Sequence, residues 1–239
     1  MMNSQGSFVE VEAMPSLAPG EPHLACVLLV DTSGSMTGAP INSLNAALQR
    51  FKENVSMDEM AQKRVDVAIV EFNSTTRVVQ PFTPILKMNP PILQTTGMTA
   101  MGAGIELAID IAKEKNRIYI EQGTPVFKPW IFMITDGAPT DDITRAAERI
   151  REEEGKGTHG KLKFFALGVP GYSPDVLQEL TRHQGEHPRI MELTDTDFSG
   201  IFNWLSQSMV AISVSRIGDQ VQLPNLPDNA RVVPAGWGS

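Results

Sequence analysis

Three side chains with oxygen donors follow the first long apolar run of the sequence. Residues 27–36 read VLLVDTSGSM, so Asp31, Ser33 and Ser35 come at alternate positions where the run ends. A turn or a helix cap does not need one carboxylate and two hydroxyls together. The stretch therefore raises the question of what these three groups would bind.

Two further polar residues stand where an α/β sheet would bring them to the same place. Asp136 ends the apolar run at 130–135 (WIFMIT) as Asp31 ends the run at 24–30 (LACVLLV), and Thr99 lies in TTGMTAMGAG, just before an expected helix. Ligands of open α/β sheets bind beyond the carboxyl ends of the strands, where the strand order reverses. If the two runs are neighbouring strands, both carboxylates face one crevice.

The five residues share one kind of donor chemistry. All of them offer oxygen, and neither thiolate nor imidazole accompanies them. Oxygen donors suit Mg²⁺ better than Zn²⁺, with Mn²⁺ and Ca²⁺ as further candidates. The sequence therefore predicts a site for a hard cation.

The elements that must position this site alternate along the chain. Continuous apolar runs predict buried strands, and apolar residues spaced by three and four predict helices. The expected strands are 24–30, 65–72, 76–80, 130–135, 162–169 and 189–193, and the expected helices lie near 40–55, 105–115, 143–150, 174–180 and 198–209. This alternation predicts an open, doubly wound, mostly parallel α/β sheet with helices on both faces. The short NST interval predicts that 76–80 is one antiparallel edge strand.

The motifs resemble those of a known family. Asp-x-Ser-x-Ser in DTSGSM, Thr99 in TTGMTAMG and Asp136 in TDG follow the order of the metal-ion-dependent adhesion site (MIDAS) of von Willebrand factor A (VWA) domains. The resemblance covers residues 23–215 and implies the Rossmann-like VWA fold. KPWIFMITDGAPTDD and IFNWLSQSM resemble the bacterial TerY-like branch, which is associated with tellurite resistance. An N-terminal lead (1–22) and a proline-rich tail (216–239) depart from that branch.

The resemblance implies a binding module and not an enzyme. Ser33, Ser35 and Thr99 would ligate Mg²⁺ through their hydroxyls, and Asp31 and Asp136 would act directly or through water. An open coordination position would accept an Asp or Glu carboxylate of a partner protein. The TerY-like branch suggests a Ser/Thr kinase or a PP2C-type phosphatase as that partner.

Two other functions remain open. A Mg²⁺-dependent phosphohydrolase of the haloacid-dehalogenase type would also place an aspartate at the end of the first strand. It needs a second carboxylate two residues later as general acid, where this chain has Ser33. The other alternative is a structural VWA module whose metal site is vestigial.

Composition limits the surroundings in which the chain works. A net charge of −8 argues against binding to nucleic acid or to anionic lipid. The single cysteine, Cys26, cannot form an internal disulfide, and no apolar run approaches the roughly 20 residues of a membrane helix. With no secretory signal in the first residues, we expect a cytoplasmic protein.

Some segments can be interpreted either as functional or as purely structural. Asp141 and Asp142 would enlarge the acidic rim of the site or, as we expect, cap the next helix. His183 and His187 have a metal-like spacing, but Gly185 between them argues against a zinc site. We expect the tail to dock on its own domain, and SFVEVEAM (7–14) to suit an added edge strand.

Overall fold

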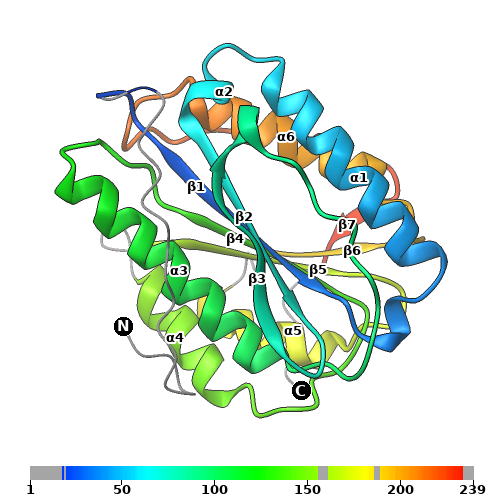
Figure 1. Ribbon diagram of the computed structural model, residues 1–239. Coiled ribbons are helices and arrows are strands. Elements are labelled where there is room, and N and C mark those ends of the chain that lie inside the picture. Colours follow the sequence, from blue (N-terminus) through cyan, green and yellow to red (C-terminus); the bar gives the residue numbers. More distant parts are fainter. Residues whose placement is uncertain (1–17, 19, 156–160, 186–188, 234–239) are drawn as a thin grey trace.

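The structure, a computed structural model, describes residues 18, 20–155, 161–185 and 189–233. In these residues seven strands form one sheet in the order β3-β2-β1-β4-β5-β6-β7 (Figure 1). The strands are β1 Leu24–Asp31, β2 Val65–Phe72, β3 Thr76–Pro84, β4 Trp130–Thr135, β5 Lys163–Gly168, β6 Ile190–Leu193 and β7 Ala230–Val232. The central five are parallel, whereas β3 and β7 pair antiparallel at the two edges.

Helices cover both faces of this sheet. The α-helices are α1 Ala39–Ser56, α2 Ala61–Arg64, α3 Met101–Glu121, α4 Thr144–Glu154, α5 Pro174–Thr181 and α6 Ser199–Ser213, and short 3₁₀ helices are η1 Gly34–Met36, η2 Ile85–Lys87 and η4 Arg182–Gln184. Figure 1 shows α1 and α6 on one side of the strands and α3, α4 and α5 on the other. The predicted fold class is confirmed.

Two apolar cores result from the alternation of side chains along the strands. In β1, Leu24, Cys26, Leu28 and Val30 pack into the core with α1 and α6. The side chains between them, Ala25, Val27 and Leu29, pack into the core with α3 and α4. Because both faces are covered, β1 and β2 are buried along their whole length, which explains their continuous apolar sequences.

Two elements are longer than the sequence predicts. β3 continues through Pro81 to Pro84, with a register shift against β2 between Val67 and Val70. An edge strand and an irregular register both tolerate proline. α3 runs six residues beyond 115, because Lys115 occupies its buried face and hides the continuation of the apolar stripe.

The segment after α6 docks on its own domain, as expected. Its last described part forms β7, a second antiparallel edge strand that the sequence did not predict. The Trp204 indole N–H of α6 donates to the Pro224 carbonyl at 2.9 Å, and Leu223 and Leu226 pack against the core. The edge strand expected at 7–14 lies outside the described residues.

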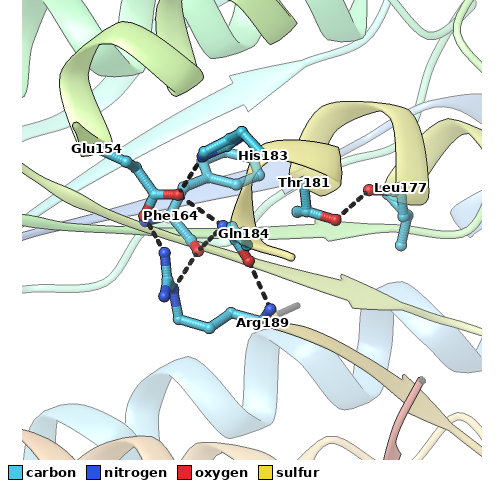
Figure 2. Close-up of polar contacts among 7 residues, drawn as sticks. All are labelled: Glu154, Phe164, Leu177, Thr181, His183, Gln184 and Arg189. Carbon is cyan, nitrogen blue, oxygen red and sulfur yellow. Dashed lines mark hydrogen bonds and ion pairs between the residues drawn. The ribbon is translucent and has the colours of Figure 1, made fainter. Parts of the chain in front are cut away.

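A buried polar junction lies where α4 meets β5 and the start of β6. Glu154, at the end of α4, accepts hydrogen bonds from His183 Nε2, Gln184 Nε2 and the Phe164 amide, each at 2.7 Å (Figure 2). Its carboxylate also pairs with the Arg189 guanidinium. One side chain thereby joins α4 to β5, η4 and the start of β6.

Candidate metal centre

The two aspartates of the predicted site lie at the ends of neighbouring strands. β1 pairs in parallel with β4 on one side and with β2 on the other, so the strand order reverses between β1 and β4. Asp31 is the last residue of β1, and Asp136 directly follows β4. Both aspartates therefore lie at the switch in strand order, where the sequence analysis placed the binding crevice.

Asp31 is fully buried and its carboxylate is held on both oxygens. Oδ1 accepts the Ser33 amide at 2.8 Å, and Oδ2 accepts the Thr135 hydroxyl at 2.7 Å. These bonds tie the turn after β1 to the end of β4. They fix both oxygens of the Asp31 carboxylate.

A chain of hydrogen bonds connects the other donors. Ser33 Oγ lies 2.9 Å from Ser35 Oγ, and Ser35 Oγ donates to Asp136 Oδ1 at 2.6 Å. Ser33 and Asp136 are buried, whereas Ser35 between them is exposed. The row therefore reaches the surface at Ser35.

Thr99 joins this group from the loop before α3. A Cβ atom added at Gly137 would lie 3.7 Å from Thr99 Oγ1 and 3.8 Å from Ser35 Oγ, so both hydroxyls border the same small space. The Thr99 carbonyl accepts the Thr140 amide at 2.9 Å, and its amide donates to Thr140 Oγ1 at 3.2 Å. The loop after β4 therefore positions Thr99.

The electrostatics of the site favour neutralisation of its carboxylates. Burial raises the pKa of Asp31, the Asp136 charge raises it further, and hydrogen bonds from Ser33 and Thr135 offset only part of this. Burial also raises the pKa of Asp136, against the hydrogen bond from Ser35. Among the described residues no cationic side chain pairs with either carboxylate. Two desolvated acids without a cation are costly when both are ionised.

The donor set fits a hard cation. In an octahedral site with Mg²⁺–oxygen bonds of about 2.0–2.1 Å, adjacent oxygens lie about 2.9 Å apart, near the 2.9 Å between Ser33 Oγ and Ser35 Oγ. Nowhere in the described ranges do three His, Cys, Asp or Glu side chains gather to hold a metal. Any cation here would thus depend on hydroxyls as well as on the two carboxylates.

Sequence reasoning missed two supporting threonines. Thr135, the buried hydroxyl at the end of an apolar strand, orients Asp31, and its position directly before Asp136 was a readable signal. Thr140 holds Thr99 across 41 residues, a contact that leaves no mark in the sequence.

Asp141, Asp142 and His183, for which the sequence allowed a functional or a structural role, make structural contacts. Asp142 Oδ1 accepts the Thr144 amide at the start of α4, as expected. Asp141 instead caps α3, accepting the Gly102 and Ala103 amides, because the loop after β4 lies against that helix. His183 bonds Glu154, and His187 lies outside the described residues.

The family comparison agrees with the geometry. The model of the von Willebrand factor type A domain matches residues 26–204, which is most of the chain. The chain belongs to this family. In this VWA domain the matched region ends within α6.

Solved structures share the fold of this VWA domain. A von Willebrand factor type A protein from Catenulispora acidiphila has a TM-score of 0.56 at 16% identity, covering 80% of this chain and 43% of that one. The pilus adhesin SpaC from Lactobacillus rhamnosus GG, in its open conformation, has a TM-score of 0.60 at 13% identity, covering 80% and 30%. Proximal thread matrix protein 1 from the mussel byssus, with a zinc-occupied MIDAS motif, has a TM-score of 0.51 at 13% identity, covering 79% and 48%.

The similarity to these structures shows the fold. The chain spans less than half the length of each of these three structures. No curated protein matches it significantly. Across the described residues, no helix has both the length and the apolar character needed to cross a membrane.

Proposed function

We propose that this VWA domain binds a protein partner through a divalent cation held by Asp31, Ser33, Ser35, Thr99 and Asp136. The cation is Mg²⁺, with Mn²⁺ and Ca²⁺ as alternatives. The observation that supports this best is the pair of buried carboxylates beside three hydroxyls, with no cationic side chain from the described part of the chain paired with them. When bound, the ion supplies a positive charge that can accept a carboxylate from outside.

The five site residues have different proposed roles, which follow from their charge and their exposure. The hydroxyls of Ser33, Ser35 and Thr99 are neutral donors, so they leave the positive charge of a cation largely uncompensated. Asp31, fixed by two hydrogen bonds, orients the turn that carries both serines. Exposed Ser35 marks the side of the site from which a partner's Asp or Glu carboxylate approaches.

A binding module accounts for these features better than a phosphohydrolase does. A nucleophilic aspartate needs a free oxygen that substrate can reach, whereas Asp31 is fully buried with both oxygens engaged. Position 33, where the general acid would stand, holds a serine whose hydroxyl cannot transfer a proton near neutral pH. A vestigial site remains the competing proposal, and cation binding separates the two.

The finer assignments rest on the sequence motifs. We propose a place in the TerY-like, tellurite-resistance branch, a cytoplasmic location, and a Ser/Thr kinase or PP2C-type phosphatase system as the source of the partner. KPWIFMITDGAPTDD and IFNWLSQSM support the branch, and the other assignments follow from that branch. The zinc-occupied motif of the mussel protein supports a divalent cation as the bound ion.

Thermal unfolding with and without cations tests the metal site. We expect Mg²⁺ at about 100 times its Kd to add roughly 2.7 kcal/mol to the stability of the chain. For a domain of this size the midpoint should rise by about 5–10 °C relative to EDTA. Parallel scans with Mn²⁺, Ca²⁺ and Zn²⁺ rank the ions.

Two threonines of the same loop provide the matched variants. Thr99→Val removes one donor at nearly constant volume and should lose most of the Mg²⁺ shift. Thr96→Val makes the same change at an exposed position whose side chain has no assigned role, and should keep the shift. Absence of a shift in the wild-type chain with all four ions would contradict the metal site.

A further inference from the structure

A cavity of about 390 Å³ opens at the β2–β3 end of the sheet. One wall comes from β2 and β3 and the other from the loop that leads from η2 to α3. Its lining residues are Glu71, Arg77, Val78, Val79, Pro91, Ile92, Leu93 and Gln94. Five of these eight side chains are apolar, so the cavity offers an apolar wall for an aliphatic group, next to the polar groups of Glu71, Arg77 and Gln94.

The loop wall of the cavity is held firmly in place. Asn45 of α1 bonds both the amide and the carbonyl of Leu93, at 2.8 and 3.0 Å, and Gln49 donates to the Pro90 carbonyl at 3.1 Å. Yet Ile92, between these anchors, is 79% exposed. The loop therefore holds the Ile92 side chain in solvent at the cavity, where a partner can contact it.

The same loop continues to the metal site. Beyond the cavity the Thr96 amide donates to the Thr32 carbonyl at 2.8 Å, and the Met98 amide donates to Ser74 Oγ at 2.9 Å. Met98 is exposed and directly precedes Thr99. The loop therefore exposes two apolar side chains, Ile92 beside the cavity and Met98 beside the proposed cation, with polar residues and buried Leu93 between them.

Charge in the cavity excludes a free ion and suits an acidic partner. Glu71, its buried acid, already pairs with Arg77, so a small anion or cation finds no unpaired charge there. The Arg77 side chain remains largely exposed at the rim, in a chain whose net charge is −8. Only the Arg77 Nε–H bonds Glu71, so the other N–H groups of this guanidinium can donate to an acidic partner segment at the rim.

We propose that the cavity receives an aliphatic side chain from the same extended partner segment whose Asp or Glu reaches the candidate metal centre. The proposal rests on the proposed function and specifies the partner. β3 lies two strands from β1, about 10 Å across, and Val78 pairs with Val70, two residues below the level of Asp31. The combined separation is about 12 Å, which an extended peptide covers in roughly four residues.

Selection of peptides from a random 12-residue display library, in Mg²⁺, tests this. The full chain should select peptides with an acidic residue and, three to five positions away, Leu, Ile or Val. Burying one such side chain should tighten binding about tenfold or more, measured as Kd for peptide pairs with and without it.

Two exposed positions give matched variants. Ile92→Asp puts a charge at the cavity mouth and should remove the aliphatic preference while the acidic residue and the Mg²⁺ dependence persist. Met57→Asp makes the equivalent change at a position 80% exposed on another part of the surface, and should select the wild-type motif. Thermal unfolding checks that both variants fold.

The outcomes separate the two proposals. Peptides that share an acidic residue and need Mg²⁺, but show no aliphatic preference, would overturn the cavity proposal and leave the metal-dependent function intact. An aliphatic preference that Ile92→Asp retains would also overturn it. Selected peptides that bind equally in EDTA would overturn the metal-dependent function itself, and with it the two-point segment.

Discussion

Two groups of buried carboxylates in this protein have opposite surroundings. Asp31 and Asp136 face hydroxyls and amides, and burial raises the pKa of both. Glu154 is just as buried, and burial raises its pKa too, but the His183 hydrogen bond and the Arg189 charge bring it below its usual range. Glu154 therefore has its counter-charge inside the chain, whereas the two aspartates have none among the described residues.

This difference supports a structural role for Glu154 and the proposed binding role for Asp31 and Asp136. Glu154 connects three elements and has all its partners in place, so it has nothing left to bind. The aspartates end two strands at the reversal of strand order and keep exposed Ser35 beside them. Burial alone does not identify a site, but burial without a counter-charge does point to one.

The largest effect on the free energy of unfolding is expected for a substitution of Glu154. Glu154→Gln keeps the shape but removes the charge that Arg189 and His183 face, and breaking a buried ion pair on one side costs about 3 kcal/mol. Urea unfolding measures the loss. Glu152→Gln, on the exposed side of the same helix, should stay within about 0.5 kcal/mol of wild type. A loss below about 1 kcal/mol for Glu154→Gln would mean that the junction is not a structural support.

The binding acid should respond to the cation instead. Asp136→Asn keeps an oxygen for the Ser35 hydroxyl, so in EDTA the free energy of unfolding should be equal to wild type or slightly higher. With Mg²⁺ at about 100 times the wild-type Kd, the variant should lack most of the roughly 2.7 kcal/mol gain. Urea unfolding curves recorded in EDTA and in Mg²⁺ give these two free energies of unfolding. If Asp136→Asn lost as much stability in EDTA as Glu154→Gln does, the proposed difference between the two groups of carboxylates would be contradicted.

Lowering the pH should stabilise the chain through Asp31 and Asp136 and destabilise it through Glu154. This is the smallest of the three expected effects. In EDTA, the cost of the raised pKa values of Asp31 and Asp136 is present at neutral pH and absent below about 3.9, so Asp136→Asn should lose its advantage as pH falls. Glu154, with a lowered pKa, contributes stability above about 4.3 that is lost as pH falls further. The deficit of Glu154→Gln should therefore also shrink, but only in stronger acid. Urea curves from pH 7 to 3.5 test both trends.

The sequence predicted the frame of the site because that frame depends on local patterns. Apolar runs that end in Asp31 and Asp136, separated by helices, specify parallel strands whose ends meet. The turn holding Ser33 and Ser35 is also local, and Asp31 bonds the amide two residues on. These features could be read without knowing any long-range contact.

What the sequence did not reveal depends on contacts across the fold. Thr140 holds Thr99, and Asp141 caps α3, through loops that meet only in the folded chain. Lys115 looked like the end of a helix because a lysine on an apolar face breaks the pattern, although its Nζ stacks over the Tyr119 ring at 4.6 Å. The Glu154 junction joins residues up to 35 positions apart and has no motif.

The last strand has a consequence for where the domain can be cut. A chain shortened to residue 215, where the regular alternation of elements stops, would lose β7 and leave the main chain of β6 unpaired. An open strand edge is a template for other chains, whereas β7 is three residues long and carries the exposed, charged Arg231. A stretch without any recognisable motif thus protects the sheet from adding foreign strands and from aggregation.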